Sequence, residues 1–295
     1  MKLGQECRYC LLKSQTHKVD FYINYDKKKI YLEKLEDLCL HYGNNLPSPL
    51  LMRQISLLHQ EIFGFTVDYS QEKIKFNNLC LSYESRIEEL IEQSEDKLLL
   101  AIKFAIVGNL IDFAKFDKFD EDLFPYFKEQ ALSQELDEST YLKLKEQLAK
   151  AKKITYLLDN CGEVVFDKIL IRIIKELYPS LEVIVVVRGK EIINDCTYFD
   201  TSMVGLDKIA KIIDNGTDIP GTYLEEISSE CKETMLSSDL IISKGLGNVE
   251  TLHGSKLNIF YLFLVKCEFI ANLFGLKLFQ SALCNELDLI KKIRV

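Results

Sequence analysis

The sequence has no long hydrophobic run, no secretory leader and no excess of basic residues. Its 295 residues contain no apolar run of about 18 or more, so no membrane-spanning helix is predicted. The first residues lead into polar sequence without the apolar core of a signal peptide, and we therefore expect a cytoplasmic protein. Asp and Glu number 45 against 37 Lys and Arg, a net charge of −8. This balance argues against nucleic-acid binding, which depends on a basic surface.

The nine cysteines form no recognisable disulfide or zinc pattern. They are odd in number and scattered, which is typical of free thiols in a reducing compartment. Only Cys7 and Cys10 form a Cys-x-x-Cys, and a structural zinc site needs four ligands, so we expect a pair of buried helix cysteines instead. No Cys-x5-Arg run follows Cys161, which argues against a cysteine-based phosphatase.

The chain changes character near residue 150. Residues 1–150 are predicted to form a helical N-terminal region, and residues 151–295 an α/β domain. In the second part short β-branched runs alternate with helical segments, one of them over residues 163–177. Strands are expected at 154–158, 182–187, 208–213, 239–243 and 258–265. This alternation predicts a doubly wound, mostly parallel sheet that is covered on both faces.

Three polar clusters follow three of these strands. They are Asp159-Asn160-Cys161-Gly162-Glu163, the segment from Arg188 to Thr197, and Lys244-Gly245-Leu246-Gly247-Asn248-Val249-Glu250. Ligands of doubly wound sheets bind beyond the carboxyl ends of the strands. One such cluster alone is typical of a turn and a helix cap, but three at neighbouring strand ends favour a functional site.

The residue types in these clusters indicate a particular chemistry. Asp159, Asn160 and Asp195 offer only oxygen ligands, which suit a hard divalent ion such as Mg²⁺ or Mn²⁺. Lys244 lies on a glycine-flanked loop where backbone N–H groups can also point at an anion. Arg188 can add a forked contact to a phosphate. A metal with cations and no covalent nucleophile predicts phosphoryl transfer to water.

The same segments resemble the motifs of a known family, the damage-control phosphatases of the DUF89 domain, also called ARMT-like. The three clusters resemble its three motifs in the same order. Further matches are Gly108-Asn109-Leu110-Ile111-Asp112-Phe113, Lys266-Cys267 and the Cys-x-x-Cys from Cys7 to Cys10, which resembles the family's prokaryotic branch. The resemblance covers nearly the whole chain. It implies a helical region packed on an α/β domain with a three-layer core.

The resemblance also implies one divalent metal ion (Mg²⁺, Mn²⁺, Co²⁺ or Ni²⁺) held by Asp159, Asn160 and Asp195. The implied substrates are small phosphorylated metabolites, including sugar phosphates and damaged phospho-compounds. Lys244 is implied as a phosphate contact. Asn109 and Asp112 are implied to reach the cleft from the helical region.

The resulting hypothesis is a metal-dependent phosphatase, a phosphoric monoester hydrolase whose metal-activated water attacks the phosphoryl group. The expected catalytic residues are Asp159, Asp195 and Lys244. The expected substrate-binding residues are Arg188, Asn194, Lys244, Asn248, Glu163, Asn109 and Asp112. The family's motif carries Gln where Leu246 stands here, so the substrate preference is expected to differ. The sequence makes no prediction of oligomeric state.

Two other functions fit parts of the pattern. A doubly wound sheet also hosts S-adenosylmethionine, as in a carboxyl methyltransferase, but no Gly-x-Gly-x-x-Gly follows the first strand. A non-catalytic phosphometabolite-binding protein would share the metal and phosphate groups. His253 follows the third cluster and could act as a general base, although a structural role is expected for a histidine on a helix face.

Overall fold

The computed structural model describes residues 1, 4–43, 45–110 and 122–293. Helices fill the first half of the described chain, and the sheet begins at residue 153. The helices before the sheet are α1 Gln5–Lys18, α2 Tyr25–His41, α3 Ser48–Phe63, α4 Ser70–Leu81, α5 Glu84–Glu92, α6 Lys97–Val107, α7 Phe124–Ser133 and α8 Glu138–Lys150. The expected division of the chain into two domains at residue 150 stays a prediction.

A six-stranded sheet of order β3-β2-β1-β4-β5-β6 forms the centre of the molecule. Its strands are β1 Lys153–Leu157, β2 Glu182–Val187, β3 Lys211–Asp214, β4 Leu240–Lys244, β5 Ile259–Leu264 and β6 Ser281–Asn285. The first five are parallel and β6 is antiparallel to β5. The expected α/β fold with a mostly parallel sheet is confirmed. The strand expected at 208–213 begins only at Lys211, because a 3-10 turn occupies Leu206–Lys208.

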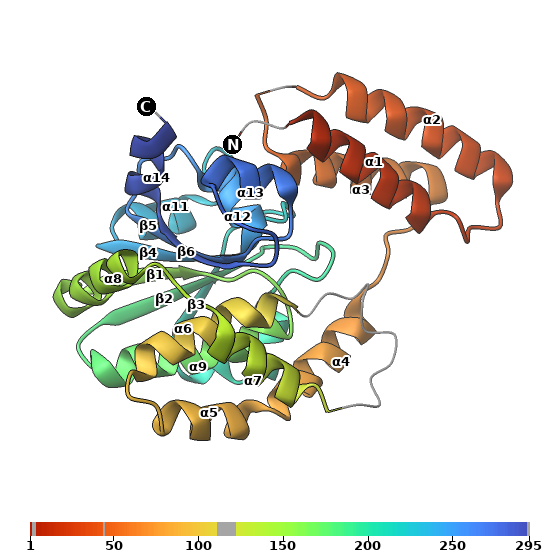
Figure 1. The fold of residues 1–295 in the computed structure, drawn as a ribbon. Helices are drawn as coiled ribbons and strands as arrows, with labels where there is room; N and C mark the ends of the chain where they lie inside the picture. Colours follow the sequence, from red (N-terminus) through yellow and green to blue (C-terminus); the bar gives the residue numbers. More distant parts are fainter. Residues whose placement is uncertain (2–3, 44, 111–121, 294–295) are drawn as a thin grey trace.

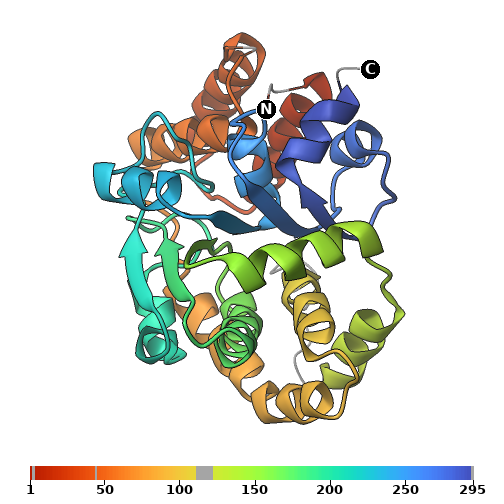
Figure 2. The same cartoon turned by 90° about the vertical axis from the view of Figure 1, so that its left-hand side faces the viewer.

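Helices cover both faces of this sheet and make three layers (Figures 1 and 2). Successive strand residues point to opposite faces. In β1, Tyr156 therefore joins one core with α6 and α9, whereas Leu157 joins the other core with α11 and α12. The remaining helices are α9 Glu163–Leu177, α10 Tyr198–Met203, α11 Ser229–Leu236, α12 Gly245–Leu252, α13 Glu268–Phe274 and α14 Glu286–Ile293.

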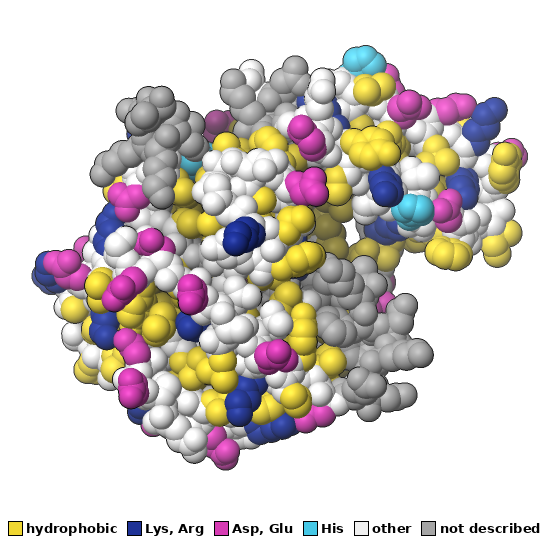
Figure 3. Space-filling view, viewed as in Figure 1, with side chains coloured by type: hydrophobic (Ala, Val, Ile, Leu, Met, Phe, Trp, Pro, Cys, Tyr) yellow, Lys and Arg dark blue, Asp and Glu magenta, His cyan; other side chains and the backbone are white. Residues whose placement is uncertain are grey.

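Helices α1, α2 and α3 pack on one another around a small core of their own (Figure 1). The loop between α1 and α2 exposes apolar side chains, and Ile23 in this loop is fully exposed. Side chains of both charges are interspersed on the face shown in Figure 3. Within the described ranges, no helix is both long enough and apolar enough to cross a bilayer.

Gly108 lets α6 end in close contact with α9. A Cβ atom at this position would lie 2.3 Å from Cδ2 of Phe166, and Phe166 is fully buried. This close approach places Asn109, the next residue, over the first turn of α9. Close packing against Phe166 therefore explains why a glycine occupies position 108.

We predict that Gly108→Ala destabilises the protein, because neither the helix nor the buried ring has room for a methyl group. The free energy of unfolding should fall by about 1–3 kcal/mol, as in other overpacked cores. Urea unfolding measures this change. Gly43→Ala is the control, since its Cβ would meet side-chain atoms of Leu46 only at 3.6 Å. Equal midpoints for the two variants would contradict the packing argument.

Candidate active site

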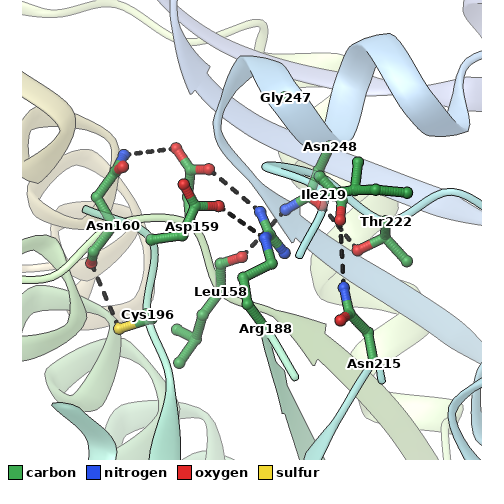
Figure 4. Close-up of polar contacts among 12 residues, drawn as sticks. Leu158, Asp159, Asn160, Arg188, Cys196, Asn215, Ile219, Thr222, Gly247 and Asn248 are labelled. Atoms are coloured by element: carbon green, nitrogen blue, oxygen red, sulfur yellow. Dashed lines mark hydrogen bonds and ion pairs between the residues drawn. The ribbon is translucent and has the colours of Figure 1, made fainter. Parts of the chain in front are cut away.

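Asp159 lies at the centre of the polar cluster beyond the sheet (Figure 4). It follows β1 by two residues, and its carboxylate is buried. Its Oδ2 atom accepts hydrogen bonds from Nδ2 of Asn160 at 2.6 Å and from Nδ2 of Asn109 at 3.2 Å. Its Oδ1 atom lies 3.5 Å from Nη2 of Arg188. The first predicted cluster therefore meets both the second cluster and the α6 end.

The second cluster contributes a buried ion pair. Arg188 follows β2 directly and is 1% exposed, and its Nε donates to Oδ2 of Asp195 at 2.6 Å. The two loops are also joined through the backbone, because the N–H of Cys196 donates to the carbonyl of Asp159 at 2.8 Å. Asn160 and Asp195 form an isolated antiparallel bridge. The structure thus brings together the three side chains expected to hold a metal.

Lys244, the last residue of β4, has a fully buried ammonium group. Its Nζ donates to the carbonyl of Ala105 at 2.7 Å, to Oε1 of Glu163 at 2.6 Å and to Oδ1 of Asp167 at 2.7 Å. An ammonium has three donors, so these bonds use all of them. The expected contact of Lys244 with a phosphate stays a prediction, and it requires one of these bonds to be exchanged.

Glu163 connects this ammonium to the Asp159 cluster. It is 1% exposed and begins α9. Its Oε2 atom accepts from Nδ2 of Asn109 at 2.7 Å and from Nδ2 of Asn160 at 3.2 Å. The amide of Asn160 therefore turns its nitrogen toward two carboxylates, so that its oxygen is the atom available for a ligand.

The other expected binding residues lie at the margin of this cluster. Asn248 is fully buried and ties α12 to the end of β1, since its Nδ2 donates to the carbonyls of Leu158 and Lys244 at 3.1 and 2.8 Å. The side chain of Asn194 is half-buried, and its backbone carbonyl accepts from the N–H of Cys161. Asp112 lies outside the described residues.

Gly245 is required by the position of Asp159. Its φ is +73°, a backbone conformation that residues other than glycine rarely adopt. A Cβ atom at this position would also lie 1.9 Å from Oδ2 of Asp159. The third cluster therefore fixes the first by close backbone approach as well as through Lys244. A glycine directly after the strand, which the sequence suggested for anion binding, here makes room for a carboxylate.

Burial raises the pKa of several carboxyl groups in this cluster. The pKa of Asp159 is raised to about 8 by burial, with the negative charges of Glu163 and Asp195 adding to the effect. Burial also raises the pKa of Asp195 to about 6, against the opposing effect of Arg188. If every carboxyl is ionised, four negative charges face two positive ones. The six groups are Asp159, Glu163, Asp167, Asp195, Arg188 and Lys244.

Cys7, Cys10 and His253 lie outside the contacts described above for this cluster. Cys10 is exposed and Cys7 half-buried, so the expectation of a buried pair is wrong for Cys10. The thiol of Cys7 contacts Cys267 instead. In the described part of the chain, no group of three or more His, Cys, Asp or Glu side chains is arranged to hold a metal, which gives no support to a zinc site at Cys7. His253 lies at the end of α12, and its Nδ1 is 2.9 Å from Oε2 of Glu286.

Two further facts bear on the site. Burial raises the pKa of the Cys161 thiol well above its ordinary value, which agrees with the argument against a thiolate nucleophile. Sequence reasoning missed Lys73 and Asn77 of α4, although both are nearly or fully buried. The available signal was their position on the same apolar stripe as Phe76 and Cys80.

Comparison with known proteins gives consistent results. Residues 4–281 match the model of the damage-control phosphatase ARMT1-like domain. A protein of Pyrococcus horikoshii named damage-control phosphatase PH1575 is 31% identical and covers 92% of this chain and 93% of its own. One of Archaeoglobus fulgidus, named damage-control phosphatase, is 30% identical over 93% of this chain and 96% of its own. The crystal structure of a DUF89 family protein (PH1575) from P. horikoshii superposes with a TM-score of 0.82 at 30% identity, over 97% of this chain and 99% of that one.

We predict that Lys244→Met lowers the free energy of unfolding by about 3–5 kcal/mol, because Glu163 and Asp167 lose their buried cation. The uncompensated carboxyl groups will then bind protons in the folded state. Since the stability of such a state falls as pH rises, the loss should be larger near pH 8 than near pH 5. Urea unfolding at both pH values measures the effect.

Lys145→Met is the matched control for this prediction. Lys145 is half exposed and pairs with Asp96, and such surface pairs contribute at most about 1 kcal/mol. If the free energy of unfolding fell no more in Lys244→Met than in Lys145→Met, Lys244 would not be the cation on which the buried carboxylates depend.

Proposed function

The chain belongs to the damage-control phosphatase ARMT1-like domain family, and from this premise we propose that it is a metal-dependent phosphatase of small phosphorylated metabolites. One observation carries the proposal. When all four are ionised, the buried carboxylates beyond the sheet carry two more charges than the two cations that contact them. Buried charges need compensation, and a divalent cation supplies the amount required.

The residues of the cluster fit such an ion. Asp159, Asn160 and Asp195 would hold it through oxygen atoms, which suits Mg²⁺, Mn²⁺, Co²⁺ or Ni²⁺. The backbone bridge between Asn160 and Asp195 supports this assignment, because it keeps two of the three close. When bound, a divalent ion supplies a Lewis acid for the phosphoryl oxygens and lowers the pKa of a coordinated water.

The side chains of the protein would bind and orient the phosphate. Nη1 of Arg188 is buried and has no hydrogen-bond partner among the residues that the structure describes. A phosphoryl oxygen would satisfy this donor, and the guanidinium would stabilise charge that develops on it. Asp159 or Asp195 would orient the attacking water. Lys244 and Asn109 would hold Glu163 in place. A direct contact of Lys244 with the phosphate would require the exchange of one of its three hydrogen bonds.

The proposed substrates are sugar phosphates or damaged phospho-compounds. Two relatives carry the name damage-control phosphatase, which supports this class. Leu246 lies in the first turn of α12 and cannot donate a hydrogen bond where the family motif has Gln. The preference among such substrates is therefore expected to differ from that of relatives that keep the glutamine.

The test is phosphate release by chelator-treated protein, with sugar phosphates, nucleotides and p-nitrophenyl phosphate, each with Mg²⁺, Mn²⁺, Co²⁺ or Ni²⁺. Asp159→Asn should lower metal-dependent release by more than about a hundredfold, because even residues that only orient metal ligands contribute up to this factor. Without metal this variant should be as stable as the wild type, since the change removes a charge from an acidic cluster.

Asp37→Asn is the control variant, because Asp37 is exposed and forms an exposed pair with His41 on α2. It should release phosphate like the wild type. A folded wild-type protein without turnover under any metal would contradict the proposal. Calorimetry with S-adenosylmethionine would then test the methyltransferase alternative.

The raised pKa values predict how metal binding depends on pH. Asp159, with a pKa of about 8, and Asp195, with a pKa of about 6, bind protons more tightly in the folded than in the unfolded chain. The metal-free protein should therefore lose stability as pH rises toward 8. A metal must displace these protons. For each proton displaced, the affinity for Mn²⁺ should therefore increase up to about tenfold for every unit of pH.

Thermal unfolding with and without Mn²⁺, between about pH 5.5 and pH 8.5, measures this dependence. The increase in Tm on adding Mn²⁺ should grow with pH, and it should do so less in Asp159→Asn. A metal-induced shift that is constant over this range would mean that the carboxyl groups are already ionised without metal.

A further inference from the structure

Helix α4 contacts both loops that carry the proposed metal ligands. One side of its buried stripe meets the β1–α9 loop, where Oδ1 of Asn77 accepts from the N–H of Gly162 at 2.6 Å. Gly162 has φ +70°, and a Cβ there would lie 3.2 Å from Cβ of Phe76. The helix and the loop are therefore in direct contact two residues after Asn160.

The same asparagine also reaches the first turn of α10, the helix directly after the β2–α10 loop. Its Nδ2 donates to Oδ1 of Asp200 at 2.9 Å, and both residues are fully buried. Asp200 forms a capping box with Thr197, whose N–H donates to Oδ2 of Asp200 at 2.9 Å. Asn77 thus connects the β1–α9 loop to the helix that follows the β2–α10 loop through one amide group.

Lys73, one turn earlier on α4, adds a charged contact to the second loop. Its Nζ lies 2.8 Å from Oδ2 of Asp200 and 2.7 Å from Oε2 of Glu191. Burial alone would lower the pKa of Lys73, but Asp200 and Glu191 raise it above its ordinary value, so the ammonium stays charged. Glu191 also lines a cavity of about 480 Å³. The loop that carries Asp195 is therefore fixed at Glu191, and the helix directly after this loop is fixed at Asp200.

We propose that Lys73 and Asn77 are positioning residues, which set the separation of the two loops so that Asn160 and Asp195 face one metal ion. The inference rests on the proposed function. The bridge between Asn160 and Asp195 joins the two loops directly, and the contacts of α4 with Gly162, Glu191 and Asp200 add a second connection. Asn77 acts through Gly162 and Asp200, and Lys73 through Glu191 and Asp200, rather than by touching the proposed metal ligands.

Two adjacent asparagines provide a matched test. Asn77→Ala removes the bridging amide, whereas Asn78→Ala changes an exposed neighbour on the same helix. The Kd of Mn²⁺ is measured by calorimetry on chelator-treated protein, far below the Tm of each variant. We expect Asn77→Ala to weaken Mn²⁺ binding about 10- to 100-fold, the usual effect of losing a residue that orients ligands. Asn78→Ala should bind Mn²⁺ like the wild type.

Lys73 is tested by separating charge balance from positioning. The variant Lys73→Met leaves Asp200 buried without its cation, so its free energy of unfolding should fall. The double variant with Lys73→Met and Asp200→Asn removes both charges and should recover stability. Mn²⁺ binding should stay weak in the double variant, and Lys73→Arg should restore part of it. A double variant that regains both stability and the wild-type Kd would show that Lys73 is only structural and would overturn its positioning role.

Hydrogen exchange of the metal-free protein gives a second readout. In Asn77→Ala, peptides covering residues 158–164 and 188–198 should exchange faster than in Asn78→Ala. Faster exchange confined to α4, or an unchanged Kd, would overturn the inference. A wild-type protein that neither binds Mn²⁺ nor releases phosphate would overturn the proposed function, while the exchange of the two loops would still decide whether α4 fixes them.

Discussion

The ammonium group of Lys244 is the contact on which the arrangement of the site depends. It joins the end of β4 to the last turn of α6 through Ala105, and to the first turns of α9 through Glu163 and Asp167. Tyr156 of β1 completes this set, with its hydroxyl 2.6 Å from Oδ1 of Asp167. Four elements from distant parts of the chain thus converge on one buried cation. Because such a cation is costly to bury without partners, each element holds the others in place.

The carboxylates that satisfy Lys244 also create the charge excess of the site. Glu163 faces the ammonium with one oxygen and the amides of Asn109 and Asn160 with the other. Its charge adds to the burial that raises the pKa of Asp159. The fold therefore concentrates negative charge where Arg188 alone does not balance it. Natural proteins depart from the rule of matched buried charges mainly at functional sites, and this departure agrees with the proposed metal.

The sequence predicted the sheet, and the polar clusters that the structure brings together at its edge, through patterns that are local in the chain. The strand at Glu182–Val187 and the helix at Glu163–Leu177 were predicted with the observed bounds, because the strand is a continuous apolar run and the helix has apolar residues at helical spacing. Strand β6, Ser281–Asn285, was missed, since its residues are small or polar and it pairs antiparallel at the edge. The full engagement of Lys244 could not be predicted either, because its partners are 77 to 139 residues away in the sequence.

The contacts of α4 show why such long-range partners matter at this kind of site. In a doubly wound sheet the strands are fixed by their ladders, but the loops at their carboxyl ends are not. Here Gly162 of the β1–α9 loop and Asp200, in the first turn after the β2–α10 loop, have a shared hydrogen-bond partner in Asn77, far upstream in the sequence. Asn109 makes an equivalent contact to Asp159 and Glu163 from the end of α6. The helices that precede the sheet in the sequence therefore supply the contacts that hold the loops, and an ion bound between these loops would depend on side chains that never touch it.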